Sequence, residues 1–246
     1  GASADARGGP VSRVVVAGRW DGGIPVLPTG DALAAIGRGV LSGDPGAAVV
    51  TVPVGTGPTF DEAVAALRSQ ASFVRVPADA SSSREAGVCV AETLGMQRTV
   101  IVEGGHNASP DCGIGFLEGL LGDSCIDPRR PEALADALTR AQDLVADADV
   151  DLVCAASTAR PLVGLDSILA VAPDLEPIES QDTALTAALT QAFAHRPLRR
   201  RQLLAGQEVH PARLRGSGAG GGVGAVIAAI GGRIVSTGDL LSQLLD

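Results

Sequence analysis

Residues 216–224 read Gly-Ser-Gly-Ala-Gly-Gly-Gly-Val-Gly, and the apolar run Ala225-Val-Ile-Ala-Ala-Ile230 follows them directly. Six of these nine residues are glycine, so the backbone carries almost no side chains at the point where the apolar run predicts that a helix begins. Amide N–H groups at such a helix start can approach a phosphate or carboxylate, at the positive end of the helix dipole. The same glycines would also let a helix pack tightly on a sheet, and spacing alone does not separate the two interpretations. The candidate ligand-binding residues of this stretch are Gly216, Gly218, Gly220, Gly221 and Gly222.

Three of these glycines also satisfy the G-x-G-x-x-G pattern of dinucleotide-binding folds: Gly216, Gly218 and Gly221. That pattern is informative only when a buried strand comes directly before it. The preceding residues, Pro211-Ala-Arg-Leu-Arg215, make a poor buried strand. The sequence therefore does not predict a dinucleotide site here.

Away from the glycine stretch, the chain alternates short valine-rich runs with helical patterns. This alternation is typical of an α/β fold with largely parallel sheets flanked by helices. The predicted strands are 13–17, 47–54, 72–77, 98–103, 151–156 and 233–236. The predicted helices are 32–41, 60–69, 83–94, 113–121, 131–146, 181–193, the run after the glycine stretch, and a terminal helix from 238.

The polar segment 78–84 is a candidate boundary between two parts of the chain. We expect a disordered N-terminus over 1–12 and a shortened Rossmann-like first domain over 13–80. A second α/β domain over 81–246 then carries the glycine-rich loops.

Composition excludes several classes of protein. The formal charge of −9 argues against nucleic-acid binding, which depends on neutralising phosphates. All 19 basic residues are arginine, so no P-loop lysine or Schiff-base lysine is available. The four cysteines form no C-x-x-C pair and the three histidines lie far apart, which argues against a metal site. We find no signal peptide and no long apolar span, and therefore expect a cytoplasmic protein without a membrane partner.

Two further loops follow predicted strands and are rich in small residues. The first is Glu103-Gly-Gly-His-Asn-Ala-Ser-Pro-Asp-Cys-Gly-Ile-Gly115, which leaves a strand and enters a helix, the usual ligand crevice of open α/β sheets. Its Asp residue can cap the helix or contact a ligand or metal. Its His and Asn can donate to an oxyanion or form a surface turn. The candidate residues here are Gly104, Gly105, His106, Asn107, Asp111 and Gly113.

The second loop is Ser157-Thr-Ala-Arg-Pro-Leu-Val-Gly164. Arg160 can clamp a carboxylate or phosphate through two parallel hydrogen bonds. An exposed arginine before a proline is the simpler alternative. Ser157 and Arg160 are the candidate ligand-binding residues of this loop.

Taken in order, the three loops resemble the two-domain bacterial glycerate kinase family, which makes phosphoglycerate from ATP and glycerate. The family's G-A-G-A-A-G-G-x-G-A is similar to residues 216–225, and its G-G-S-A-T-N-D-G-G-A-G to residues 104–115, with Asp111 and Gly113 on matching positions. The family's A-C-D-V-T-N-P-L-V-G is similar to residues 155–164. The resemblance covers about residues 13–246 and implies a two-part glycerate-kinase-like architecture.

The chain departs from the family where the resemblance would place charged groups. The family's D-S-[YF]-K after the first strand is Gly18-Arg-Trp-Asp-Gly22 here, so the lysine is absent. Its D-G-G-E-G-T after the second strand is Gly55-Thr-Gly-Pro-Thr59, which lacks both acids. The aspartate of C-D-V-T-N-P, a candidate catalytic base in the family, is Ser157 here. Asp111 and Asp21 remain the only catalytic candidates.

Phosphoryl transfer depends on positioned cations, metal-holding acids and an oriented hydroxyl. We therefore expect a pseudoenzyme that binds a small organic acid, a phosphate-containing ligand or a protein partner, with no certain cofactor. The alternative is an active kinase for glycerate or a related hydroxy acid, using ATP and Mg²⁺ and completed by another subunit. If an uncovered sheet edge or apolar face is present, it would seek a protein partner or a second copy.

Overall fold

The computed structural model describes residues 12–18, 27–55, 58–67, 71–77, 81–104, 111–171, 182–194 and 210–245. The chain divides into two units, one made of residues 1–69 with 241–246 and the other of residues 70–240. Each unit is an α/β structure built on parallel strands, and we describe them separately.

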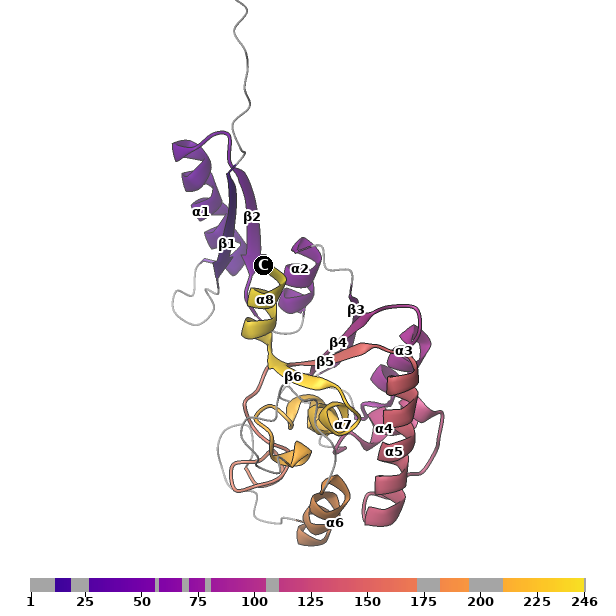
Figure 1. Cartoon of the computed structure of the whole chain (residues 1–246). Helices are drawn as coiled ribbons and strands as arrows, with labels where there is room; N and C mark the ends of the chain where they lie inside the picture. Colours follow the sequence, from indigo (N-terminus) through magenta and orange to yellow (C-terminus); the bar gives the residue numbers. More distant parts are fainter. Residues whose placement is uncertain are drawn as a thin grey trace, which may run out of the picture. The chain divides into compact units, whose positions relative to one another are not determined.

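The first unit is a strand–helix–strand element with one added helix (Figure 1). Strand β1 (Arg13–Gly18) pairs in parallel with β2 (Ala48–Pro53), and α1 (Thr29–Gly43) makes the crossover that parallel pairing requires. A β-carbon on Gly37 of α1 would lie 3.3 Å from Val49 Cγ1, so the helix backbone approaches β2 closely. Helix α2 (Pro58–Ala66) follows β2.

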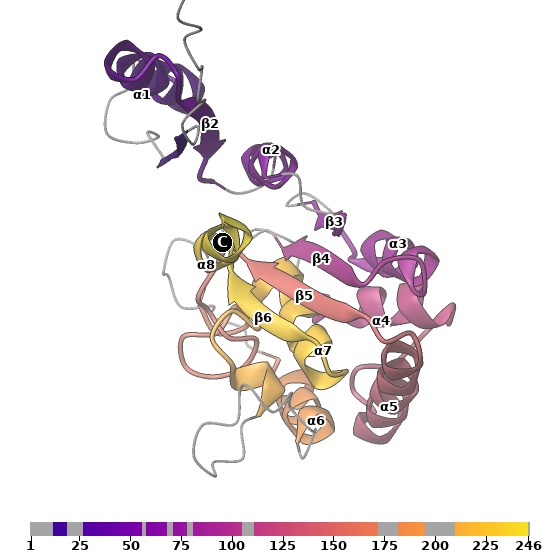
Figure 2. The ribbon, with the colours of Figure 1, turned by 45° about the horizontal axis from the view of Figure 1, so that its top comes forward.

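The second unit contains a sheet of four parallel strands in the order β3-β4-β5-β6 (Figure 2). These strands are β3 (Ser72–Val76), β4 (Thr99–Gly104), β5 (Asp151–Ala156) and β6 (Arg233–Ser236). The helices that lie wholly in this unit are α3 (Arg84–Thr93), α4 (Ile114–Leu121), α5 (Pro131–Asp147), α6 (Thr183–Phe193) and α7 (Val223–Ala229). Helix α8 (Thr237–Leu245) begins in this unit, and its residues from 241 on are assigned to the first unit. Two short 3₁₀ turns, Pro211–Arg213 and Ala219–Gly222, come before α7.

The core of the second unit lies between the sheet and the helices around it. Val100 of β4 and Leu152 of β5 belong to one cluster with residues of α3, α4, α5, α6 and α7. Its largest fully buried side chains include Phe116, Leu138 and Ile227. Near-continuous apolar strands of this kind are expected in parallel sheets, whose faces are covered by helices.

Helices α3 and α4 approach each other closely because glycines face each other across the contact. A β-carbon on Gly87 of α3 would lie 2.1 Å from the carbonyl oxygen of Phe116 in α4. One on Gly119 of α4 would lie 2.1 Å from the carbonyl oxygen of Arg84. Backbone therefore packs against backbone along this helix pair.

The α/β fold with parallel sheets flanked by helices is confirmed, and all six predicted strands are present within one residue of their expected ends. The division between the units differs from the predicted boundary at residue 80. Strand β3 pairs with β4 and so belongs to the second unit, and residues 241–246 belong to the first. The N-terminus predicted to be disordered lies outside the described residues, except for Ser12. No helix in the described part of the chain is long and apolar enough to cross a membrane.

Candidate functional site

The three candidate loops meet at the carboxyl ends of β4 and β5. A β-carbon on Gly104, the last residue of β4, would lie 2.5 Å from the backbone nitrogen of Gly220. The hydroxyl of Ser157, just after β5, donates to the carbonyl oxygen of Gly104 at 2.7 Å. The N–H of Gly218 donates to the carbonyl oxygen of Arg160 at 3.0 Å. The fold thus brings candidate residues from all three loops together where α/β sheets usually bind ligands.

The glycine stretch is buried and packs backbone against backbone. Gly220, Gly221 and Gly222 have φ angles of 63°, 68° and 115°, which disfavour residues with side chains. A β-carbon on Gly222 would lie 2.5 Å from the carbonyl carbon of Cys112. These glycines are therefore needed for packing, as the simpler of the two interpretations requires. Ligand binding by them remains a prediction.

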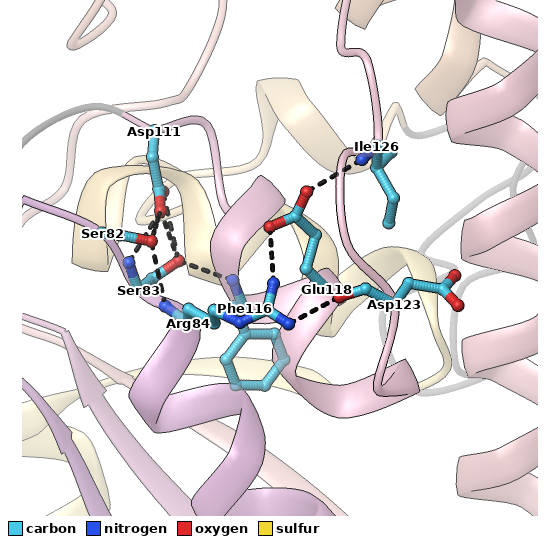
Figure 3. A network of polar contacts seen from close by, with 8 residues as sticks. All are labelled: Ser82, Ser83, Arg84, Asp111, Phe116, Glu118, Asp123 and Ile126. Carbon is cyan, nitrogen blue, oxygen red and sulfur yellow. Dashed lines mark hydrogen bonds and ion pairs between the residues drawn. The ribbon is translucent and has the colours of Figure 1, made fainter.

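Asp111 ties together the starts of α3 and α4 (Figure 3). Its carboxylate accepts hydrogen bonds from the N–H of Ser83 at 2.7 Å, the Ser83 hydroxyl at 2.8 Å and the N–H of Gly113 at 2.9 Å. The Ser82 hydroxyl lies 3.3 Å from the same carboxylate. The Ser83 hydroxyl in turn accepts from the N–H of Phe116 in α4 at 2.8 Å. Asp111 is not the N-cap of α4, because that position is Gly113, and its carboxylate instead accepts from the N–H groups of Gly113 and Ser83 just before the two helices.

The same helix pair carries a second polar cluster (Figure 3). The guanidinium of Arg84 donates to the Glu118 carboxylate at 2.9 Å and to the carbonyl oxygen of Asp123 at 2.6 Å. The other oxygen of Glu118 accepts from the N–H of Ile126 at 2.8 Å. Both charged groups therefore fix the chain that leaves α4.

Arg160 is engaged within its own loop. Its guanidinium donates to the carbonyl oxygens of Asp166 at 3.2 Å and Ser167 at 2.8 Å, and also to that of Val171. These bonds close the loop after β5 upon itself. A role for Arg160 in ligand binding stays a prediction, and it would need to compete with these bonds.

Four predicted site residues lie outside the described part of the chain: Asp21, Gly105, His106 and Asn107. Among the described residues, no group of three or more His, Cys, Asp or Glu side chains is placed to hold a metal ion.

Glu103 and Ser83 are buried polar side chains near the site that the sequence analysis did not single out. Glu103, next to last in β4, is 1% exposed and lies 3.7 Å from the Nε of Arg75 in β3. The sequence did carry a signal for Glu103, which is a charged residue at the end of an otherwise apolar strand. Ser83 is 3% exposed, and its sequence context gave no sign of its role between two helices.

The pKa values of the two buried thiols beside the site, Cys112 and Cys154, lie far above the ordinary thiol value. Burial, with smaller effects from the charges of Asp111 and Asp182, raises the pKa of Cys112 to about 12. Burial, with a smaller effect from the charge of Glu103, raises the pKa of Cys154 to about 12. Both thiols therefore stay protonated in the folded protein at neutral pH.

We expect the free energy of unfolding to fall as pH rises from 9.0, the ordinary thiol pKa, towards about 12. In that window the unfolded state has lost thiol protons that the folded state retains, so rising pH favours unfolding, by about 1.4 kcal/mol per pH unit for each thiol. The chain has no lysine and no tyrosine, so few other groups titrate there.

Urea unfolding at a series of pH values measures this slope, and Cys154→Ala should reduce it by about half relative to the parent protein. Iodoacetamide at neutral pH should label the exposed Cys125 and spare Cys112 and Cys154 until the protein unfolds. A flat stability profile above pH 9.0 would contradict the assignment of neutral buried thiols.

No protein-family model matches this sequence, and neither does any curated protein sequence. Among solved structures, the chain is similar to the crystal structure of a "putative glycerate kinase 2" from Salmonella typhimurium LT2, with a TM-score of 0.62. The match covers 96% of this chain and 74% of that chain at 17% sequence identity. At this identity the likeness shows the fold alone. The chain has a glycerate-kinase-like fold.

Proposed function

We propose that this protein binds a small organic acid or a phosphate-containing ligand at the carboxyl ends of β4 and β5 and transfers no phosphoryl group. The observation that supports binding is the convergence of Gly104, Ser157 and Gly218, from three separate loops, at one edge of the sheet. Ligands of open α/β sheets bind at this edge.

The proposal that the protein is non-catalytic is supported by what the polar side chains already do. The oxygens of Asp111 accept hydrogen bonds from three donors within 2.9 Å, which commits most of their lone pairs. Ser157, where the resembled family carries its candidate base, donates to Gly104. These bonds of Asp111 and Ser157 support the proposal, because phosphoryl transfer needs acids that are available to hold metal and a base that orients the hydroxyl.

A second candidate function is ATP-dependent phosphorylation of glycerate or a related hydroxy acid. The fold shared with a protein described as a putative glycerate kinase favours it. The charged and metal-holding groups that phosphoryl transfer needs would then come from residues outside the described part of the chain, such as Asp21 and His106, or from another subunit. A third candidate function is the binding of a protein partner instead of a small anion. The experiment has to distinguish it from the first two.

The first experiment is isothermal titration with MgATP, D-glycerate and phosphoglycerate, followed by a phosphoryl-transfer assay. We expect an acid or phosphate compound to bind, and no transfer from ATP. Ser157→Ala should weaken binding by about tenfold, since it removes one bond, worth about 1.4 kcal/mol, that holds two of the loops together.

The matched control is Gly39→Ala in α1, where a β-carbon meets nothing within 4 Å. It should leave ligand binding unchanged. Robust phosphorylation of glycerate would overturn the non-catalytic proposal in favour of the kinase. If none of the three compounds binds, the small-anion proposal is wrong and a protein partner becomes the better hypothesis.

A further inference from the structure

Glu103 carries a buried carboxylate at the carboxyl end of β4, beside the loops that converge on Gly104. Its side chain is 2% exposed, and the Nε of Arg75 in β3 lies 3.7 Å from its Oε2. A buried carboxylate needs a cation nearby, because removing an unpaired charge from water is costly. Apolar side chains of similar volume can fill such a position without that cost. Packing alone therefore does not account for the ion pair.

Strand pairing places Arg75 at the edge of the sheet where the candidate site lies. In the parallel register of β3 and β4, Arg75 is opposite Glu103, and Val76 is opposite Gly104. Neighbouring strands lie about 4.8 Å apart. The carbonyl oxygen of Gly104 in turn accepts from the hydroxyl of Ser157 at 2.7 Å. Arg75 is thus one residue along its strand from the position beside Gly104.

Arg75 is the member of the ion pair that a ligand can reach. Its neighbours Val74 and Val76 are 7% and 2% exposed and belong to the core cluster, so the Arg75 side chain lies on the opposite face of the strand. That side chain is 29% exposed, against 2% for Glu103. Part of Arg75 is therefore accessible from solvent, while the carboxylate beside it is enclosed.

Arginine is well suited to bind an organic acid or a phosphate compound. Its planar guanidinium can donate two parallel hydrogen bonds to a carboxylate or a phosphate. The chain has no lysine, so its permanently charged cations are arginines. Arg160, the arginine that the sequence singled out, donates to three carbonyl oxygens near its own loop. Arg75 instead pairs with a carboxylate, at the edge where Gly104 and Ser157 meet.

We propose that Arg75 binds the carboxylate or phosphate group of the ligand, while the charge of Glu103 limits how tightly that anion binds. This inference rests on the anion-binding function proposed above. The negative charge of Glu103 opposes an anion that approaches the same guanidinium. The two residues therefore act on the ligand with opposite signs. Loss of Arg75 removes the cation that binds, and neutralising Glu103 removes a repulsion.

The test is isothermal titration of the full chain with D-glycerate and with phosphoglycerate. We expect the parent protein to bind at least one of them. Arg75→Ala should raise the dissociation constant of that compound roughly 10- to 100-fold, because a charged hydrogen-bond donor is lost. Glu103→Gln should lower it by about threefold or more, because the substitution keeps the shape and an acceptor oxygen but removes the charge. An ion pair that only stabilises the fold would not give opposite signs.

The matched control is Arg233→Ala. Arg233 of β6 also pairs with a carboxylate of the neighbouring strand, Asp151 of β5, at 3.1 Å, and its side chain is 27% exposed. Both residues are the first of their strands, at the opposite edge of the sheet, so binding should not change. If Arg75→Ala does not fold because Glu103 is left unpaired, Arg75→Met combined with Glu103→Gln replaces it and should bind as weakly.

Three results would overturn the inference and leave the proposed function standing. They are binding by Arg75→Ala as tight as by the parent protein, binding that Glu103→Gln does not tighten, and an equal loss of binding in Arg233→Ala. If the parent protein binds neither compound, the proposed function is wrong and the inference falls with it.

Discussion

Gly87→Ala is expected to destabilise the protein by about 3–5 kcal/mol, although alanine is the better helix former by about 1 kcal/mol. The new β-carbon would lie 2.1 Å from the carbonyl oxygen of Phe116 and 2.9 Å from the nitrogen of Leu120. Both are backbone atoms of α4, so no side chain can rotate away. The helices would have to separate, and the packing of the buried Val90 and Leu117 would loosen. Urea unfolding monitored by circular dichroism measures the loss.

The control for this prediction is the same substitution in an open position. Gly39 lies inside α1, and a β-carbon there would meet nothing within 4 Å, so Gly39→Ala should stabilise its helix by about 0.5–1 kcal/mol. Opposite signs for the two substitutions would establish that the backbone contact, not helix propensity, decides the result. Equal stability of Gly87→Ala and the parent protein would show that α3 and α4 are not in backbone contact.

Asp111→Ala is expected to cost about 3 kcal/mol of stability, because it removes a charged acceptor from several donors at once. The buried Ser83 loses the acceptor of both its N–H and its hydroxyl. Gly113 loses the acceptor of its N–H at the start of α4. Thermal unfolding and the unfolding free energy in urea both report this loss.

A hydrogen-exchange measurement adds a local test of the same prediction. The amide of Phe116 donates to the Ser83 hydroxyl, and its protection should fall in Asp111→Ala as that hydroxyl loses its orientation. Asp143→Ala is the control, since Asp143 is an exposed aspartate of α5, and it should change stability by less than about 0.5 kcal/mol. If the two aspartate variants behave alike, Asp111 does not hold the helix starts together.

The strands could be predicted from sequence because their signal is local. Runs such as Val100-Ile-Val102 and Leu152-Val-Cys154 are apolar throughout, as buried parallel strands are. The assignment of β3 to the second unit could not be predicted, because its pairing with β4 depends on contacts across the sheet. The polar segment after β3 looked like a boundary, but sheet pairing, not polarity, decides where a unit ends.

The candidate site was predictable in position but not in its bonding. Gly-rich loops after two strands marked the carboxyl edge of the sheet, as general rules for α/β folds lead one to expect. Two partners of Asp111, Ser83 and Ser82, lie 28 and 29 residues before it, and the carbonyl that Ser157 binds lies 53 residues away. No spacing rule predicts such partners. Asp111 and Ser157, two of the candidate ligand-binding residues, also hold the loops in place through these bonds.

The division of the chain has a consequence for how the protein is made on the ribosome. The first unit combines residues 1–69 with 241–246, so its last piece is synthesised after the whole of the second unit. The second unit is continuous, and domains generally fold as they emerge. It can therefore fold first, and by doing so it shortens the effective loop that closing the first unit must span. The first unit, although most of it is made earliest, would then be completed last.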